Sequence, residues 1–313
     1  MAKSTTTKAK SKTTKKKASS KAVRTTVPKS SKKLVTKPST KTTKKAVVAK
    51  SSKPATNSSR TALLRRPQVI ASALYGGLAV AAGMLMNTDS AQIFIGHLSK
   101  DELASRASTV LAPAATSVVE LEFRWLLVGL LVTAAFIALL RGTRYAQQEL
   151  NGLKSRVQKL RWIELGVTGA LAFQIVALLN GLQDLVALKL SLVSIIAAAF
   201  FGWLFERENA ATGKPSRSLY LASAVAVIAP VLALIGTMFA TYVYGIERSP
   251  WYAYAAAAVV SVWLLVTIRS IRTNLLRRNS PQNYVAVDRS YNRLSMLAKV
   301  ALAIVLISGL YAN

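Results

Sequence analysis

Seven apolar stretches of about 20 residues follow one another along the chain, and they restrict its fold more than any other feature. They lie at about 67–87, 119–140, 162–182, 185–205, 218–243, 251–271 and 291–311. A helix of this length just crosses the hydrocarbon core of a bilayer, where every backbone polar group must be bonded within the protein. The pattern therefore predicts an all-α bundle of seven transmembrane helices embedded in the lipid bilayer.

The composition divides the chain into two parts. Hydrophobic residues make up 52% of the chain, although its formal net charge is +30. Residues 1–60 contain 17 Lys and 2 Arg with no acidic or aromatic residue. Such a segment buries too little apolar surface to offset the entropy lost on ordering. We therefore expect a disordered basic tail over residues 1–62 and a membrane domain over residues 63–313. The absence of cysteine excludes disulfides and thiolate metal sites.

The charges between the apolar stretches orient the predicted bundle. The segments between spans two and three and between spans six and seven are rich in Arg and Lys, whereas the loop at 88–118 is nearly balanced. Basic loops collect on the cytoplasmic side of membrane proteins. We therefore predict a multi-pass protein of the cell membrane with a cytoplasmic N-terminus and an outside C-terminus.

Two ionisable residues lie inside the apolar stretches, Lys299 in the seventh and Glu164 near the start of the third. Lys299 lies about 9 Å beyond the interfacial Arg293 by helical rise, and its side chain leans back toward the helix N-terminus. Glu164 lies about 4.5 Å beyond Arg161. Because the two depths overlap, we expect Lys299 and Glu164 to pair, with Ser295 one turn earlier on the same helix face.

Simpler interpretations of these residues remain open. Lys299 can extend its long stem to the interface, and Glu164 can be an interfacial residue paired locally with Arg161. Glu206 lies at the inner end of the fourth stretch, where we expect it to reach water.

A buried lysine amine can also condense with an aldehyde to form a Schiff base. In a seven-helix membrane protein with the lysine in the last helix, the expected aldehyde is retinal. The protonated Schiff base then needs a counterion, for which Glu164 is available. The candidates for lining the retinal pocket are Trp263, Phe239 and Phe173, although such aromatic residues also serve ordinary helix packing or face lipid.

The same residues lie in motifs that resemble those of the heliorhodopsins. RWIELGV at 161–167 resembles the Arg-Trp-(Val/Ile)-Glu-Tyr-Ser stretch that opens the third helix of this family. LSMLAKVALA at 294–303 resembles its Leu-Ser-Leu-Val-Ala-Lys stretch in the seventh helix. Weaker matches occur in family order at 62–70, 180–185, 200–208 and 228–234.

The resemblance implies a seven-helix retinal protein with a cytoplasmic N-terminus and all-trans-retinal bound covalently. Lys299 matches the retinal-bearing lysine, Glu164 the counterion and Ser295 the serine beside the Schiff base. Arg161 matches the arginine three places before the counterion.

The chain departs from the family pattern at several positions. The family's Tyr-Ser after the counterion is Leu165-Gly166 here, and its tryptophan five places after the lysine is Ile304. The family often has polar or histidine residues in its first two helices, whereas the single histidine, His97, lies in the outer loop.

We therefore predict a light-sensing photoreceptor without enzymatic activity. Light would change the Schiff base–Glu164 pair and bias a two-state helix arrangement, which a cytoplasmic signalling partner would detect. Sensing is favoured over pumping because no second carboxylate is evident deep in the bundle. A homodimer is also expected. The alternative is a retinal-free transporter or anchor, in which Lys299 and Glu164 form a buried ion pair or an ion site.

The basic tail is expected to bind polyanions by charge alone. Each basic residue near an anionic leaflet gains about 1 kcal/mol. Nucleic acid is the other candidate partner of residues 1–60, and binding would tolerate any sequence because no aromatic residue is present to stack on bases. A solvated tether with no partner also remains open.

Overall fold

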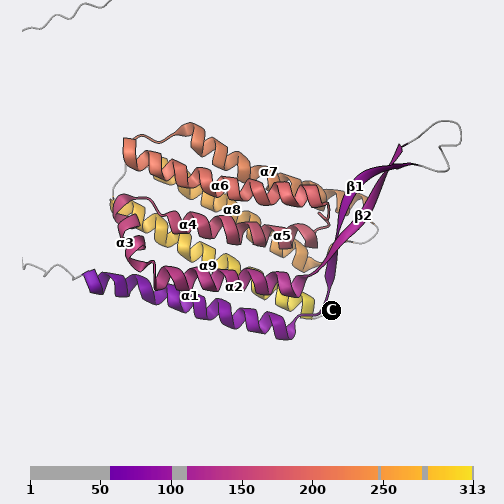
Figure 1. The fold of residues 1–313 in the computed structure, drawn as a ribbon, viewed down its shortest axis with the longest axis horizontal. Coiled ribbons are helices and arrows are strands. Elements are labelled where there is room, and N and C mark those ends of the chain that lie inside the picture. Colours follow the sequence, from indigo (N-terminus) through magenta and orange to yellow (C-terminus); the bar gives the residue numbers. More distant parts are fainter. Residues whose placement is uncertain (1–56, 101–110, 246–247, 277–280, 312–313) are drawn as a thin grey trace, which may run out of the picture. The chain divides into compact units, whose positions relative to one another are not determined.

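The computed structural model describes residues 57–100, 111–245, 248–276 and 281–311 of the 313-residue chain. Residues 1–56, which hold most of the predicted basic tail, lie outside the described residues. The helices run side by side, with a two-stranded hairpin at one end and the short helix α3 at the other (Figure 1).

The described elements follow one another in chain order. The helices are α1 Asn57–Leu85, α2 Phe123–Gly142, α3 Ala146–Ser155, α4 Lys159–Glu164, α5 Ala170–Leu179, α6 Leu185–Thr212, α7 Arg217–Tyr244, α8 Trp251–Leu276 and α9 Pro281–Tyr311. The strands are β1 Ser90–Lys100 and β2 Leu111–Glu122, and a short π-helical segment, η2 Leu165–Gly169, joins α4 to α5.

Seven spans in the described part of the chain are long and apolar enough to cross a membrane, which confirms the predicted seven-helix bundle. They are Pro67–Leu85, Phe123–Gly142, Lys159–Leu179, Leu185–Thr212, Arg217–Tyr244, Trp251–Ser270 and Asn283–Tyr311. The last span begins earlier than expected because α9 starts at Pro281, and proline is favoured at the first position of a helix.

The third and fourth spans are separate helices because the short segment between them carries a helix start signal. Asp184 precedes α6, and its carboxylate accepts a hydrogen bond from the Ala187 backbone N–H at 2.8 Å. Such an N-cap satisfies one of the amide groups that the first turn leaves unpaired.

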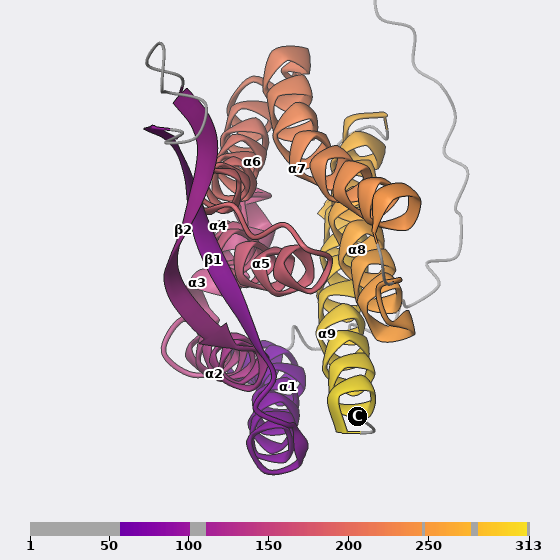
Figure 2. The ribbon, with the colours of Figure 1, turned by 90° about the vertical axis from the view of Figure 1, so that its right-hand side faces the viewer.

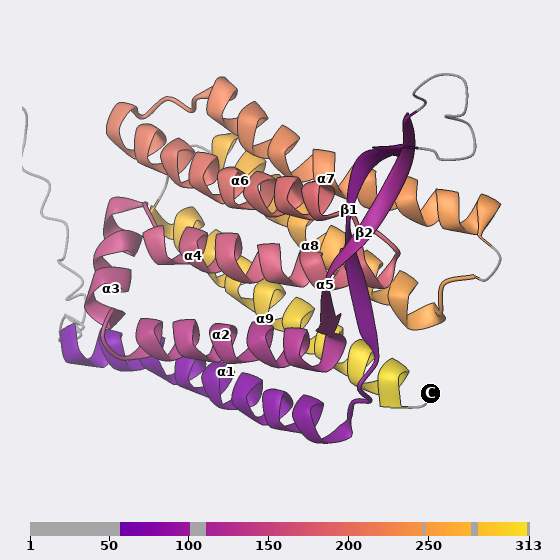
Figure 3. The ribbon, with the colours of Figure 1, turned by 45° about the vertical axis from the view of Figure 1, so that its right-hand side comes forward.

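The loop expected at 88–118 forms a β-hairpin instead. Its strands pair antiparallel from Ser90 opposite Glu122 outward, with an irregularity after Ile93. The backbone N–H of Phe94 also donates to the Gln183 carbonyl at 2.9 Å, which ties the hairpin to the turn between α5 and α6 (Figure 3). The two strands were not predicted, because the alternation of apolar and polar residues in a half-exposed strand is a weaker sequence pattern than the continuous apolar run of a membrane span.

The third span is the most enclosed element of the bundle. Figure 2 shows α5 surrounded by α2, α6 and α8, and α5 contacts all three. In the most apolar window of this span 72% of the residues are buried, against 22–50% in the other spans. Side chains of the third span therefore face protein rather than lipid.

Helices α4 and α6 approach closely at Gly202. A Cβ atom at this position would overlap the indole ring of Trp162. The ring cannot move aside freely, because Trp162 is buried and its Nε1 donates to Glu206 Oε2 at 2.9 Å. Glycine at 202 is thus required by packing.

We expect Gly202→Ala to destabilise the protein by about 1–3 kcal/mol, the usual cost of overpacking. The measurement is the midpoint of thermal unfolding of the purified protein. Gly236→Ala on α7 is the matched control, because nothing lies within 4 Å of a Cβ atom there. Equal midpoints for the two variants would contradict the close approach of α4 and α6.

Candidate functional site

Lys299 lies wholly inside the bundle. The residue is 0% exposed, and its Nζ atom lies 2.5 Å from Glu164 Oε1 on α4. Ser295 Oγ, one turn earlier on α9, donates to the same oxygen at 3.3 Å. The pairing expected from helix depth is present, and Lys299 does not extend to the end of the bundle.

Glu164 has a second cationic partner, Arg141 at the end of α2. Arg141 Nη1 donates to the other carboxylate oxygen, Glu164 Oε2. Arg141 Nε donates to Glu149 Oε1 at 2.6 Å, and its Nη2 donates to Asn292 Oδ1 at 3.3 Å. The predicted span boundaries put Arg141 in the basic segment between spans two and three, whereas it lies in the last turn of the second span. It is only 3% exposed, because three acceptors from three helices replace water around its guanidinium group.

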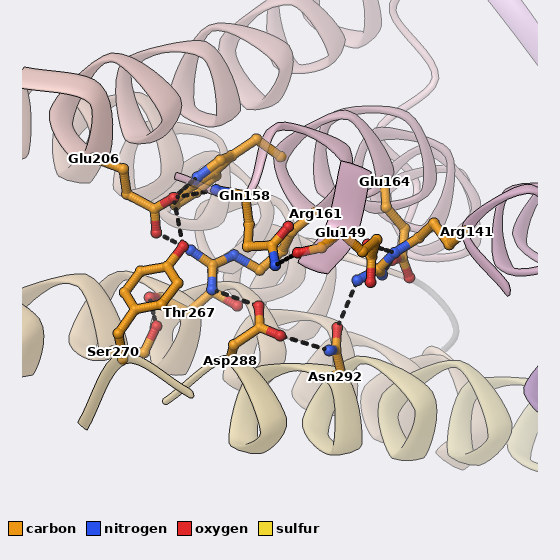
Figure 4. Close-up of polar contacts among 12 residues, drawn as sticks. Arg141, Glu149, Gln158, Arg161, Glu164, Glu206, Thr267, Ser270, Asp288 and Asn292 are labelled. Atoms are coloured by element: carbon orange, nitrogen blue, oxygen red, sulfur yellow. Dashed lines mark hydrogen bonds and ion pairs between the residues drawn. The ribbon is translucent and has the colours of Figure 1, made fainter. Parts of the chain in front are cut away.

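Arg161 belongs to a second buried cluster, shown in Figure 4. Its Nη2 donates to Glu206 Oε1, and its Nη1 donates to Asp288 Oδ1 at 3.0 Å. Glu206 Oε2 accepts three further hydrogen bonds, from Trp162 Nε1, the Gln158 backbone N–H and the Tyr284 hydroxyl.

One interpretation left open for Glu164 and one expectation about Glu206 are therefore wrong. Arg161 does not pair with its neighbour Glu164, because Glu206 and Asp288 bind its guanidinium. Glu206 does not reach water but is 6% exposed, and the bonds that it accepts offset its desolvation. Because Glu206 and Asp288 are both buried within spans, the expectation that the bundle holds no second carboxylate is wrong as well.

Asn292 joins the two clusters into one. Its Oδ1 faces Arg141, and its Nδ2 donates to Asp288 Oδ2 at 3.1 Å (Figure 4). We call the connected residues the buried charge chain; its members are Lys299, Glu164, Arg141, Glu149, Asn292, Asp288, Arg161 and Glu206. It contains three cations and four carboxylates.

A comparison with protein families matches the family described as Heliorhodopsin over residues 64–310. The chain belongs to the heliorhodopsin family. No curated protein compared with the chain matches it. Membership in the heliorhodopsin family makes this chain a multi-pass membrane protein and a retinal-binding photoreceptor of the rhodopsin type, which favours the retinal interpretation over a retinal-free transporter or anchor.

The interior around Lys299 fits the retinal that the heliorhodopsin family implies. Along α9, the buried polar residues Asp288 and Ser295 precede Lys299, whereas Ala303 and Leu306 follow it on the same face and are buried and apolar. Lys299 thus lies at a boundary: a carboxylate is on one side of its amine, and buried apolar side chains follow on the other. An apolar aldehyde needs this combination.

Two aromatic rings flank the amine. Lys299 Nζ lies 5.5 Å from the ring centroid of Trp263 and 5.5 Å from that of Tyr75. Trp263, a predicted pocket residue, is 1% exposed, and within the described residues its Nε1 has no hydrogen-bond partner. Tyr75 was missed, because a single tyrosine in the first span carries no distinguishing signal.

The other two predicted pocket residues lie differently. Phe173 is fully buried on α5, in the apolar core of the third span. Phe239 is 65% exposed on α7. The structure therefore does not bring Phe239 to Lys299; its ring lies on the outer, lipid-facing side of the helix.

Glu149 lies on α3, outside the seven spans, and is 4% exposed. Burial raises the pKa of its carboxyl above the ordinary value of 4.5, although the neighbouring Arg141 opposes this shift. A carboxyl group whose pKa is raised on folding stabilises the fold most when it is protonated. Its contribution is therefore complete below the unfolded value and declines as pH rises through the folded value.

We expect the pH dependence of stability to reveal this group. From pH 4.5 upward, the unfolding midpoint of the parent should fall more steeply than that of Glu149→Gln, which cannot ionise. Thermal unfolding across a pH series measures the difference. Glu208→Gln, which removes an exposed carboxyl on α6, is the control and should keep the parent's slope. Identical slopes for the parent and Glu149→Gln would contradict the raised pKa.

Proposed function

We propose that the chain is a light sensor in which Lys299 carries all-trans-retinal as a protonated Schiff base and Glu164 is the counterion. The observation that carries the proposal is the position of the amine, which is 0% exposed and 2.5 Å from a carboxylate. A desolvated amine is suited to condensation with an aldehyde, and the adjacent carboxylate stabilises the resulting cation. When bound, retinal supplies a light-driven change of shape.

The protein's own residues hold the charge that this change disturbs. Glu164 Oε1 faces the nitrogen of Lys299, and Ser295 Oγ donates to the same oxygen. Arg141 binds Oε2, so the carboxylate is oriented by donors on both oxygens. A displacement of the Lys299 nitrogen would therefore weaken its ion pair with Glu164 and leave Arg141 as the main cationic partner of that carboxylate. This change can bias a two-state arrangement of helices.

The buried charged groups lie on one side of Lys299, and this distribution supports sensing rather than ion pumping. Within the described residues, the buried acidic and basic side chains lie on the α3 side of the bundle. On α9 they come before Lys299 in the sequence, and those of other helices are bonded to this part of α9 or to each other. The α9 residues beyond Lys299 on the same face, such as Ala303 and Leu306, offer no polar group to an ion. A transport path would need such groups on both sides. The proposed role is thus signalling, without catalysis.

We further propose a cell-membrane location with the N-terminus and α3 on the cytoplasmic side, where a signalling partner would bind. The basic segments beside α3 support this orientation. The tail, nearly all of which lies outside the described residues, would then face anionic lipid or nucleic acid. Assembly as a homodimer is part of the same proposal.

We expect Lys299→Ala to abolish the pigment. Parent protein reconstituted with all-trans-retinal should absorb visible light and bleach with hydroxylamine, whereas the variant should give neither signal because the condensing amine is gone. Lys189→Ala, which removes an exposed lysine of α6, is the control and should retain full colour. Covalent retinal in Lys299→Ala would refute the assignment.

We expect Glu164→Gln to weaken retention of the Schiff base proton, because its counterion is lost. The variant pigment should lose its visible band at a pH lower by about one unit or more, each unit being about 1.4 kcal/mol. Spectroscopic titration measures this shift. Glu120→Gln is the control, since Glu120 lies on β2 and accepts from Ser90. A shift in the control with none in Glu164→Gln would identify another counterion.

A further inference from the structure

Helix α3 is a ten-residue helix outside the spans, and polar contacts attach it to the bundle. Glu149 Oε1 accepts from Arg141 Nε at 2.6 Å, and the Glu149 carbonyl accepts from Gln158 Nε2 at 3.1 Å. Only Ala146 and Glu149 of this helix are buried. One residue, Glu149, therefore makes both attachments.

The apolar side of α3 borders a cavity instead of a packed core. The cavity has a volume of about 640 Å³. Leu150 and Leu153 of α3 line it, together with Pro67 of α1 and Val285 of α9. Since Ala146 and Glu149 alone are buried among the ten residues of α3, its displacement costs less than that of a packed element.

Arg141 is shared between this helix and the proposed counterion. One guanidinium group donates through Nη1 to Glu164 and through Nε to Glu149. Glu149 is also the least supported carboxylate of the buried charge chain. Its side chain has Arg141 as its one hydrogen-bond partner in the described part of the chain, whereas Asp288 also accepts from Asn292 and Glu206 from three further donors.

We propose that Arg141 couples the Lys299–Glu164 pair to the docking of α3, so that α3 leaves the bundle when that pair is disturbed. When the positive charge of the Lys299 nitrogen moves away from Glu164, Arg141 becomes the remaining ionic partner of that carboxylate. Its guanidinium group is then drawn toward Glu164 and releases Glu149. The inference rests on the proposed function, since light acts through the retinal on Lys299.

Other charged and titratable groups around the pair come from each neighbouring helix. They are Tyr75 of α1, Arg161 of α4, Glu206 of α6, and Asp288 and Tyr291 of α9. Asp288 is linked to Arg141 through neutral Asn292, and Arg161 is paired with Glu206 and Asp288. Burial also raises the pKa of Glu149, which eases protonation once Arg141 withdraws.

Coupling between two sites is reciprocal, so that α3 must also influence the pigment. Removing the cation in Arg141→Gln should raise the pH of the pigment's acid colour transition, at which Glu164 takes up a proton. Removing the anion in Glu149→Gln should lower it, because Glu164 is then the one carboxylate in the described part of the chain that is bonded to Arg141. We expect shifts of about one pH unit in opposite directions. The double variant should deviate from the sum of the single shifts, since the two residues share a contact.

Arg144→Gln is the matched control, because Arg144 lies three residues from Arg141 but is exposed. It should leave the transition unchanged. Arg141→Lys preserves the positive charge, so its midpoint should lie closer to that of the parent than the midpoint of Arg141→Gln does. Shifts of the same sign in Arg141→Gln and Glu149→Gln would overturn the coupling.

Gly152→Ala tests docking without changing any charge. A Cβ atom at 152 would lie 2.8 Å from Gln158 Oε1 and 2.8 Å from the Val157 carbonyl oxygen, so it should displace α3 from the segment that follows it. If docking matters, this variant should move the transition in the direction of Glu149→Gln. An unchanged transition would mean that α3 is not coupled to the pigment.

The movement itself can be followed with a single spin label, because the chain contains no cysteine. Gln147→Cys places a label on the exposed side of α3, and Ala211→Cys places a control label at the end of α6. Illumination should increase the mobility of the label at 147 but not at 211, and Arg141→Gln should abolish the light response. A coloured pigment with no light response at 147 would overturn the coupling alone. Failure of the parent to form any pigment would instead overturn the proposed function.

Discussion

The contact between Lys299 and Glu164 determines how the polar half of the interior is arranged. Each ion removed from water costs several kcal/mol unless its remaining donors and acceptors are also bonded. The second oxygen of Glu164 therefore needs Arg141, and the guanidinium of Arg141 needs Glu149 and Asn292. Each buried group in turn needs a further partner, and the resulting series of hydrogen bonds and ion pairs extends to the α3 end of the bundle. The buried charge chain is thus the consequence of placing one amine deep in an apolar protein.

The same constraint explains why the interior changes character at Lys299. Each charged residue of the buried charge chain has an ion-pair partner on a different helix, and these pairs fix the relative positions of α2, α4, α6 and α9. Beyond Lys299 the described core is mainly apolar, with side chains such as Ala303 and Phe173 and no buried charge. The proposed retinal Schiff base would need both environments at one residue, because it would be a cation at one end and a hydrocarbon along the rest of its length.

The sequence sufficed for features that depend on one helix at a time. Span number followed from local hydropathy, and the depths of Lys299 and Glu164 followed from helical rise. The shared face of Ser295 and Lys299 followed from their spacing of four residues. Asp288 and Asn292 extend this face, but the predicted span boundaries put Asp288 in the segment between spans six and seven. The partners of this face on other helices were not readable. The burial of Arg141 and Glu206 depends on which helices are neighbours, and a single sequence does not show this. Glu206 is buried, whereas Glu208, two residues later, is exposed.

The π-helical segment η2 separates the two environments within the third span itself. A π-turn contains one residue more than an α-turn, and one residue corresponds to about 100° of rotation around the helix axis. The faces of α4 and α5 are therefore offset by about this angle, relative to an uninterrupted α-helix. Glu164 ends α4, immediately before the offset, and Phe173 lies beyond it. The extra residue rotates α5 relative to α4 about their common axis. The side chains of α4 can therefore face the charged residues of neighbouring helices, while those of α5 face apolar ones.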